Sequence, residues 1–592
     1  MSVPSSILFE LRRRNVFRAG ALYIGAIWAL AQGIAQLGPV FGAPEWTTRA
    51  FAIAGAIGFP FWLAFAWFFE FTPEGLKRER DVEPSQSITH QTGRKLDFWI
   101  IGVLAVAVVL LLTNQLVFRR DAAAAIPNQS IAVLPLANEG GNADEQYFSD
   151  GLSEDLIITL SRFADLKVIS RGSSFKFRDS KDDSRTMGAK LGVAHLLEGS
   201  VRRVGDAVRV SAALVLAMDG STLWSERYDR PYSDLFALQD EISGAVAGAL
   251  KAKLLAGSTV LAQTDRPPSG NLDAYNAYLQ GIFYSSRATE ADHVEAVAHY
   301  TKAIELDPDY ARAWAGLSTE WTGYAQQFLE GEAAKTAYAE ARKAADKAVQ
   351  LQPGLAAGYA ARATLLRNAD FDWVRAEADS RRAVELSPAD GGAKFSLGVS
   401  LATVGRLDEA IDLTREAIGI NPLRASWQSW LSTYLSSLGR LDEAEAAIHK
   451  SLSLDPTGSG YYEQLAIIGI QRGDAAAALA AAQHEPEGSW QDIALALALQ
   501  IGNDRAAADT ALQTLIEKDA ALASMQIADV YALRRDADKT FEWLDRAWAG
   551  RDPGIDGLLF DPFILRFRDD PRFAAFCKKA GFPTVTEAKA LP

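Results

Sequence analysis

Small and apolar side chains recur with a fixed period through the C-terminal half of the chain. Five stretches begin with a small residue, alternate apolar and polar positions, and close on a proline. These prolines lie 45, 35, 34 and 34 residues apart, at Pro308, Pro353, Pro388, Pro422 and Pro456. A unit of this length forms a helical hairpin that cannot bury its own apolar face, so the period predicts an α-solenoid of stacked hairpins with an extended binding surface.

The repeat also has a conserved turn phrase within the chain. Residues 405–410 read Gly-Arg-Leu-Asp-Glu-Ala, and residues 439–444 repeat them 34 positions later. With Leu397 and Gly398 at a close approach of two helices, these units resemble the tetratricopeptide repeat (TPR). The resemblance implies about seven helical hairpins over residues 271–550, a helical cap over 551–592, and a groove that holds a protein or peptide. An ordinary helical bundle is the alternative.

The resemblance also implies which residues line the groove, because five positions of each tetratricopeptide unit usually face its concave side. Here these positions are small, hydroxylated or apolar, and only Arg312 could hold a carboxylate. We therefore expect an uncharged or amphipathic segment around Phe395 and Thr433, rather than an acidic C-terminal tail. The alternative is that these residues merely solvate a groove that binds elsewhere. The candidate partner-binding residues are Arg312, Phe395, Val399, Ser429, Thr433, Ser436, Glu463 and Gln471.

The N-terminal 120 residues have a different hydrophobic pattern. Residues 19–38, 50–69 and 98–118 contain no charged side chain. At 1.5 Å per helical residue, each run covers the roughly 30 Å of a bilayer's hydrocarbon layer. A cleavable signal peptide does not explain the pattern, because the first run is long and two more follow. The sequence predicts a membrane anchor of three transmembrane helices over residues 1–120.

Basic residues near these runs predict the orientation. Nine Lys and Arg residues lie before the first run and between the second and third, against three on the other side. The N-terminus is then cytoplasmic, and everything after Arg120 lies across the membrane. In a Gram-negative bacterium this is the inner membrane, with the large C-terminal part in the periplasm. With Cys577 as its single cysteine, the exported part has no internal disulfide.

Charge excludes one class of partner. The chain has a formal net charge of -14, and its first 120 residues carry +4, so the remainder is strongly acidic. Phosphate backbones are bound by clustered Lys and Arg, so we expect no nucleic acid partner.

Residues 128–256 predict a small α/β domain. Gly205-Asp206 and Asp219-Gly220 join three alternating runs as two-residue turns, which predicts an antiparallel meander. A helix over 150–163 would start with Glu154 and Asp155, whose charges complement its dipole. The expected strands are 130–135, 166–170, 193–203, 208–216 and 222–228, followed by a helix over 234–254.

The strand phrases of this domain resemble the TolB N-terminal-like domain. They include Ser130-Ile-Ala-Val-Leu-Pro, Phe148-Ser-Asp-Gly-Leu, Leu166-Lys-Val-Ile-Ser-Arg and Leu223-Trp-Ser-Glu-Arg-Tyr. The resemblance implies an α/β envelope domain that serves interaction and has no catalytic residues. In bacterial proteins this domain commonly stands before tetratricopeptide repeats, behind a class III nucleotide cyclase or a winged-helix regulator. The apolar N-terminal fifth has no room for either.

Motifs for catalysis are missing from the sequence. It contains no phosphate-binding loop, no His-Glu-x-x-His pair and no Gly-x-Ser-x-Gly elbow. His293 and His299 are six residues apart, whereas a helical metal pair uses four. We therefore expect no enzyme, metal or cofactor, but a membrane-anchored interaction scaffold. An envelope ligand sensor that signals through its spans is the alternative, and an apolar pocket in the α/β domain would favour it. A cyclase-related membrane protein without its catalytic domain is more remote.

Overall fold

The computed structural model describes residues 126–583, except 142–144, 164, 251–265, 288, 330 and 521, together with scattered positions between residues 20 and 78. It divides into two compact units, residues 1–126 and 127–592. The first contains an antiparallel pair of strands, β1 (Phe69–Thr72) and β2 (Gly75–Arg78). Most of the predicted membrane segments, 19–38, 50–69 and 98–118, lie outside the described residues. Of the helices that are described, none is long and apolar enough to span a bilayer.

The second unit begins with a mixed sheet in the order β5-β3-β6-β7-β8, with β4 paired to β6. Strands β6, β7 and β8 form the predicted antiparallel meander, and β3 runs parallel to both β5 and β6. The strands are β3 (Ser130–Val133), β4 (Ala137–Asn138), β5 (Lys167–Val168), β6 (His195–Val204), β7 (Ala207–Leu216) and β8 (Thr222–Pro231).

One of the two predicted turns differs in the structure. Gly205 and Asp206 join β6 to β7 directly, and Gly205 has the positive φ of +57° that such a turn requires. Strand β7 ends at Leu216 and β8 begins at Thr222, as predicted, but Asp219-Gly220 is not a two-residue turn. The Leu216 N–H donates to the carbonyl of Ser221 and the Gly220 N–H donates to that of Leu216, so residues 217–220 form a longer loop, which follows a register shift between Leu214 and Val215.

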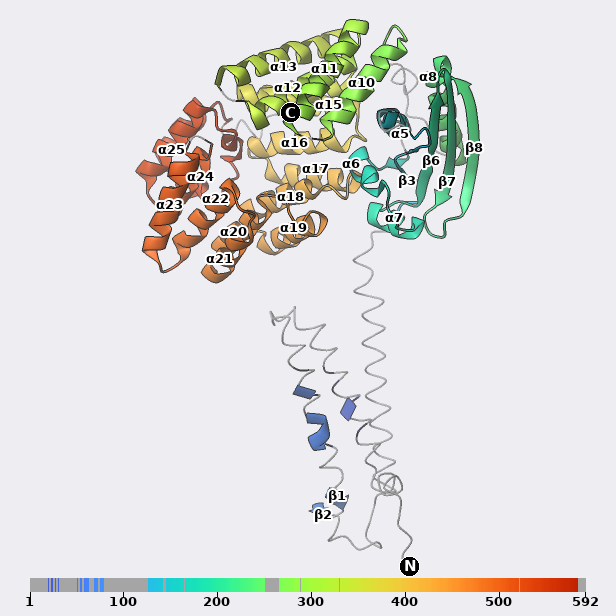
Figure 1. Cartoon of the computed structure of the whole chain (residues 1–592). Coiled ribbons are helices and arrows are strands. Elements are labelled where there is room, and N and C mark those ends of the chain that lie inside the picture. Colours follow the sequence, from blue (N-terminus) through green and yellow to red (C-terminus); the bar gives the residue numbers. More distant parts are fainter. Residues whose placement is uncertain are drawn as a thin grey trace, which may run out of the picture. The chain divides into compact units, whose positions relative to one another are not determined.

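Helices cover one face of this sheet along its length, whereas they cover the other face only near β3, and most of β8 is exposed (Figure 1). Alternate residues of a strand point to opposite faces: Ile131 and Val133 of β3 join one core, whereas Ala132 and Leu134 join another. The first core is closed by α5 and α8, and the second involves α7. The helices of this domain are α5 (Gln146–Leu160), α6 (Arg171–Ser174), α7 (Ser184–Leu191) and α8 (Leu235–Ala249).

The rest of the unit is a helical solenoid, which confirms the fold predicted from the period. Successive helices pack as antiparallel hairpins and curve into an arc (Figure 1). The hairpins are α10 (Leu272–Ser285) with α11 (Glu290–Leu306), α12 (Ala311–Phe328) with α13 (Gly331–Leu351), α14 (Ala356–Leu365) with α15 (Trp373–Leu386), α16 (Gly391–Thr403) with α17 (Leu407–Ile420), α18 (Ala425–Ser437) with α19 (Leu441–Leu454), α20 (Tyr461–Arg472) with α21 (Ala475–His484), α22 (Ser489–Ala498) with α23 (Arg505–Asp519), and α24 (Ser524–Leu533) with α25 (Ala537–Gly550).

Small residues set the helix spacing inside each hairpin. A Cβ atom at Gly398 would lie 3.1 Å from the hydroxyl of Thr414 and 3.2 Å from the carbonyl of Ala410. One repeat later, the Ser432 hydroxyl donates a hydrogen bond of 2.8 Å to the carbonyl of Ala444. The predicted close approach at Gly398 is therefore confirmed, and only a small side chain fits this interface.

The α/β domain is docked on the solenoid at two places. Near the first repeat, a Cβ atom at Gly151 of α5 would lie 2.4 Å from the Leu279 side chain of α10, so only glycine permits this contact. Near the fourth repeat, Lys176 donates to the carbonyl of Leu423, and the Leu423 N–H donates to the hydroxyl of Ser173. The second of these contacts joins two residues, Ser173 and Leu423, that are 250 positions apart in the sequence.

The last described segment returns to the middle of the solenoid. It consists of η10 (Pro553–Gly557), η11 (Ile564–Phe567) and α26 (Pro571–Lys579). The Trp373 indole N–H donates to the carbonyl of Ala580 at 2.8 Å, and its ring stacks on Phe582. We call residues 553–583 the return segment.

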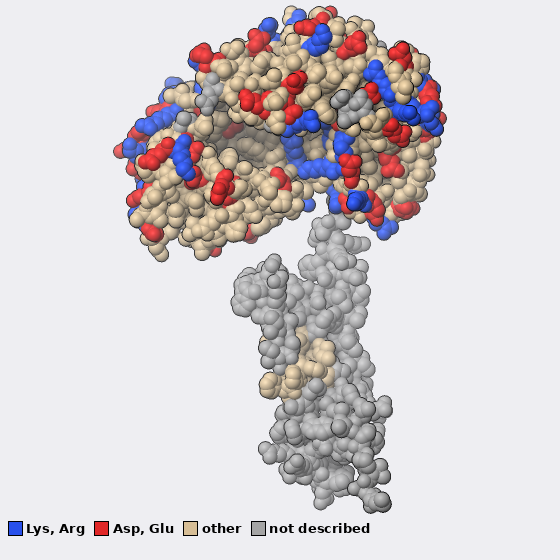
Figure 2. Space-filling model, in the orientation of Figure 1, with Lys and Arg blue, Asp and Glu red and all other residues tan. Residues whose placement is uncertain are grey.

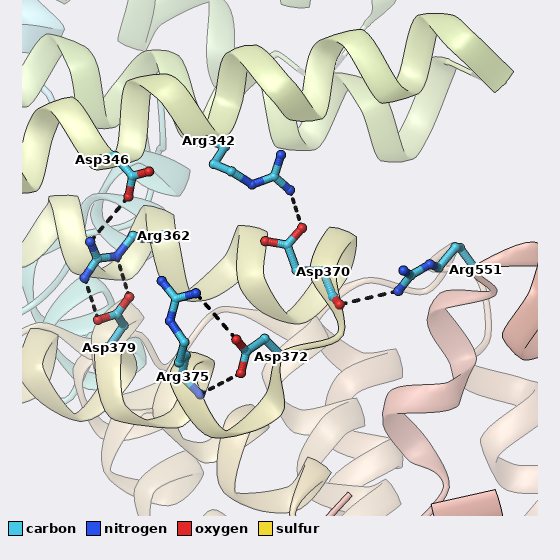
Figure 3. A network of polar contacts seen from close by, with 8 residues as sticks. All are labelled: Arg342, Asp346, Arg362, Asp370, Asp372, Arg375, Asp379 and Arg551. Atoms are coloured by element: carbon cyan, nitrogen blue, oxygen red, sulfur yellow. Dashed lines mark hydrogen bonds and ion pairs between the residues drawn. The ribbon is translucent and has the colours of Figure 1, made fainter. Parts of the chain in front are cut away.

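A polar network fixes the third repeat to its neighbours and to the last one (Figure 3). Arg362 of α14 donates two hydrogen bonds to Asp379 of α15, at 2.7 and 3.0 Å, and pairs with Asp346 of α13. Where α14 ends in a π-helical turn, η8 (Leu366–Asp370), Asp370 accepts from Arg342 through its carboxylate and from Arg551 through its carbonyl. These contacts join α13, α14 and α15 to one another and tie η8 to Arg551 at the end of α25.

Candidate functional site

The predicted groove residues lie in two different environments, one in the first half of the groove and one in the second half. In the first half of the groove, Arg312 donates a hydrogen bond of 2.7 Å to the hydroxyl of Tyr278. Phe395 is half-buried and stacks on Trp427 with ring centroids 4.9 Å apart. Val399 is buried. A partner at this end of the groove could therefore reach the Phe395 ring, but not Val399.

In the second half, the predicted residues contact one another. Thr433 is half-buried and donates to the carbonyl of Ser429 and to the side chain of Gln464. Gln471 donates to the hydroxyl of the buried Ser436 at 2.7 Å. These side chains are arranged along successive inner helices, as the repeat register predicts.

The return segment covers this second half. The Phe560 ring lies edge-on to Tyr434 with centroids 5.5 Å apart, and its carbonyl accepts a hydrogen bond from the Ser437 hydroxyl. Asp561 lies close enough to the buried Glu463 for their charges to interact. The sequence register could not reveal this occupant, because the segment does not follow the repeat pattern.

The return segment contributes Asp561 to a cluster of buried carboxyl groups that also contains Glu463 and Asp529. Burial, with the nearby Glu485 and Asp561, raises the pKa of Glu463 to about 8. Burial and Asp561 also raise the pKa of Asp529, whose carboxyl is hydrogen-bonded to that of Asp561. At neutral pH Glu463 is therefore held largely in its protonated form.

The first half of the groove is open as a cleft of about 450 Å³ between the solenoid and the α/β domain. One wall comes from α5 and α6, and the other from the first turns of α14, α16 and α18. Figure 2 shows basic side chains gathered in the hollow of the arc beside the sheet domain. The polar side chains that line the cleft are Glu154, Ser161, Arg162, Ser170, Arg171, Arg312, Ser387, Asp390, Asn421 and Arg424.

Positive charge dominates this lining, with four arginines against two carboxylates. Asp390 caps α16 by accepting from the backbone N–H groups of Gly392 and Ala393. Glu154 forms an ion pair with Arg171 at 3.5 Å. Burial, with the neighbouring Arg312 and Arg266, lowers the pKa of Arg162 to about 10. Since arginine stays protonated in proteins, this lowered pKa reflects first the cost of burying the guanidinium and then the neighbouring positive charges.

The positions of Glu154 and Asp155 correct the sequence prediction. Helix α5 begins at Gln146, so these carboxylates lie beyond its first turn and do not serve its dipole. Asp155 is instead half-buried and accepts a hydrogen bond from Gln239 at 2.9 Å. Burial raises its pKa to about 7, although the nearby Arg312 opposes this shift.

The two histidines considered as metal ligands are also placed separately. His293 is buried and bonded to the carboxylate of Glu320, and His299 stacks on Tyr284. Within the described part of the chain, no group of three or more His, Cys, Asp or Glu side chains could hold a metal ion.

The arginine cleft was missed by the sequence analysis. Arg162 and Arg171 flank a short strand of the α/β domain, whereas Arg312 and Arg424 belong to different repeats. No spacing along the chain relates them. The one available signal was that Arg424 directly precedes a repeat helix, a position that faces the groove.

A family model for the tetratricopeptide repeat matches residues 429–457, which span most of α18 and α19. The chain therefore contains tetratricopeptide repeats, as its periodicity predicts. Similar solved structures include PilF of Pseudomonas aeruginosa, 19% identical with a TM-score of 0.30, covering 38% of this chain and 98% of that one. The Cut9–Hcn1 complex is 17% identical, with a TM-score of 0.33 and coverages of 59% and 64%. Scores of this size support no argument about function.

A curated relative from Rhizobium meliloti (strain 1021) is named "Putative adenylate cyclase 3". It is 38% identical over 191 residues, which make up 32% of this chain and 32% of that protein. The chain thus matches about a third of the relative's length. This similarity relates a segment of each chain.

Proposed function

We propose that the chain is a non-catalytic interaction scaffold that binds a protein or peptide segment along its tetratricopeptide groove. The observation that carries this proposal is the unbroken series of hairpins from α10 to α25, which has an inner surface far longer than a small-molecule site. Its α/β part, which resembles the TolB N-terminal-like domain, would add a second interaction surface.

The partner segment would dock around Phe395 and Thr433, from the open first half of the groove up to the point where the return segment covers α18. The half-buried Phe395 ring, supported by Trp427, offers an apolar contact, and the Thr433 hydroxyl lies one repeat further along. For an amphipathic helix this combination provides an apolar anchor and a polar neighbour. The return segment limits the site on its other side.

Site-specific photocrosslinking in intact membranes tests this docking site. A benzophenone amino acid at Phe395 should form one discrete adduct, whereas the same group at Val374, an exposed residue of α15 outside the groove positions, should not. Thr433→Arg should abolish the Phe395 adduct, because a long charged side chain would obstruct the groove. Equal adducts at both positions, or an adduct that survives Thr433→Arg, would refute the docking site.

The membrane anchor is part of the same proposal. Three apolar runs in residues 1–120 would hold the scaffold at the inner membrane, with its groove in the periplasm and its effective local concentration raised. A periplasm-specific reporter fused after Pro127 should be active, and the same reporter fused near Pro84 should be inactive. Activity of a cytoplasmic reporter at the Pro127 junction would reverse the orientation.

A ligand sensor is the second candidate, and the cleft of about 450 Å³ favours it. Ligand sites commonly have volumes of roughly 300–1,000 Å³ and lie at domain boundaries. The cleft lies between the α/β domain and the repeats, rather than inside the α/β domain where the sequence analysis sought a pocket. A ligand that contacts both walls would couple the two domains.

A further inference from the structure

We propose that strand β8 pairs in antiparallel orientation with β8 of a second copy of this chain, so that the two sheets become continuous across a twofold axis. This interface goes beyond the scaffold function, because it involves neither the groove nor the cleft. Each proposal can therefore fail without the other. A dimer of this kind would carry two grooves, which raises the avidity for any partner that has two docking segments.

Strand β8 is the last strand of the sheet and leaves an open edge (Figure 1). It is ten residues long, and among the described residues it pairs with β7 alone. Tyr228 is buried and Trp224 and Arg230 are half-buried, whereas the other residues of the strand are exposed. A long exposed edge offers its unpaired N–H and C=O groups to another strand.

The register with β7 shows which backbone groups face outward. The Tyr232 N–H donates to the Asp206 carbonyl, one position beyond the end of the β7–β8 ladder. Because hydrogen-bonded and non-hydrogen-bonded pairs alternate in an antiparallel ladder, even-numbered residues of β8 bond to β7 and odd-numbered residues face outward. Arg227 and Asp229 thus have backbone groups directed to the open edge. The Asp229 carbonyl also accepts from the guanidinium of Arg230, a solvent-exposed contact that a second strand would replace.

The charges along β8 match one antiparallel register of the strand with itself. Outward-facing residues must pair with outward-facing residues, so the strand can shift past its copy only in steps of two. With the twofold axis at Tyr228, Arg227 lies opposite Asp229 of the second copy. Glu226 lies opposite Arg230 on the other face of the joined sheet. An axis at Glu226, Arg227 or Asp229 would instead place that residue opposite its own copy, which brings like charges together.

These charges select the register, whereas the backbone hydrogen bonds of the new ladder provide the association. The charged side chains already have contacts in the same copy, and exposed ion pairs of this kind are weak. A further charge of opposite sign can therefore join them. The existing contacts are Asp229 with Arg209 at 2.6 Å and with Arg227 at 3.9 Å, Arg230 with Glu241 at 3.0 Å, and Glu226 with the Tyr228 hydroxyl at 2.7 Å.

Helix α8 favours a second copy over an isolated peptide strand as the occupant. It packs on β8, and its Glu241 reaches Arg230, so joining two β8 strands brings two α8 helices alongside each other. The row of exposed residues that includes Glu241 also holds Ala237, Gly244 and Gly248, and a Cβ atom at either glycine would meet no atom within 4 Å. Glycine is unfavourable within a helix, but small residues let two helices approach closely. A peptide strand would need no such space.

Paired cysteine crosslinking tests the register. In a Cys577→Ser background, full chains with Arg227→Cys and with Asp229→Cys are coexpressed with different affinity tags and then oxidised. Opposite residues of the proposed ladder have Cα atoms about 5.5 Å apart, within reach of a disulfide. We therefore expect a disulfide-linked dimer that carries both tags. Either variant expressed alone should give none, because identical residues are offset by two positions, beyond the roughly 7 Å that a disulfide permits.

Copurification of two differently tagged full chains, without cysteine substitutions, measures the association. Arg227→Glu places a carboxylate opposite Asp229 of the second copy and should weaken association about tenfold or more. Gly244→Trp should act in the same direction, because it separates the two α8 helices while filling open space in a single copy. Arg202→Glu is the matched control: it makes the same charge change at an exposed position of β6, two strands away from the edge, and should leave association unchanged.

Four results would overturn parts of the proposal. A disulfide formed by Arg227→Cys with itself would overturn the register. Absence of the dimer with both tags, or an equal loss of association in Arg202→Glu and Arg227→Glu, would overturn the β8 interface. Unchanged association of Gly244→Trp would overturn the close approach of two α8 helices. A disulfide between either cysteine variant and a protein of different mass would assign the edge to another partner.

Discussion

Gly398→Arg should lower the free energy of unfolding by several kcal/mol, on the order of 3–5. The missing Cβ would already lie within 3.2 Å of the Ala410 backbone and the Thr414 hydroxyl. A longer side chain therefore cannot enter without separating α16 from α17. The charge would in addition be buried in a helix interface that has no acidic partner at this point. Chemical denaturation of the full chain, followed by tryptophan fluorescence, measures the loss.

Gly419→Arg is the control for this prediction. It makes the same substitution in the partner helix α17, at an exposed position where a Cβ atom would meet no atom within 4 Å. Because arginine is a better helix former than glycine, this variant should be unchanged or stabilised by about 0.5–1 kcal/mol. Equal unfolding midpoints of the two variants would contradict the close packing assigned to Gly398.

Glu463→Gln should stabilise the protein, and this gain should depend on pH. Burial together with Glu485 and Asp561 raises the pKa of Glu463 from 4.5 to about 8. The fold thus favours the protonated form, so the contribution of Glu463 is most favourable below pH 4.5 and is lost as pH rises toward 8. Glutamine has a similar shape and cannot ionise. At 1.36 kcal/mol per pKa unit, the gain at pH 8 or above is up to about 4–5 kcal/mol.

Unfolding midpoints of the wild type and the variant at pH 5 and pH 8 check this result. The two should nearly coincide at pH 5 and separate at pH 8, with Glu463→Gln the more stable. Glu487→Gln, at an exposed position close to Glu485 in the chain, should show no such separation. A Glu463→Gln variant that is less stable than the wild type at pH 8 would mean that the ionised carboxylate is favoured in the fold.

Local patterns predicted most of the solenoid. The period of about 34 residues placed the hairpins, and the small residues Gly398 and Ala410 marked a real interface between helices. The antiparallel meander was predicted as well, because strand alternation and turn residues are local signals. Its second turn was not, since the register shift between Leu214 and Val215 depends on how the strands pair.

In the groove, the local sequence pattern predicted the lining residues but not the segment that covers them. The repeat register indicated which residues belong to the inner helices, including Phe395, Thr433 and Glu463. It could not indicate that Phe560 and Asp561 would lie against the second half of the groove. Helical periodicity determines on which face of its helix a residue lies. Which segment covers that face depends on the path of a distant part of the chain.

The sequence by itself determined the repeat architecture, the sheet domain and the acidic character of the long C-terminal part, because each follows from residues that are neighbours in the chain. The tertiary structure alone decided the burial of Glu463 and the meeting of Arg162, Arg171, Arg312 and Arg424 around one cleft. Those features depend on contacts between distant parts of the chain, such as the approach of Asp561 to Glu463 and the hydrogen bond between Ser173 and Leu423, which are 250 positions apart. Contacts of that range arise from the packing of whole domains, for which no periodicity in the sequence exists.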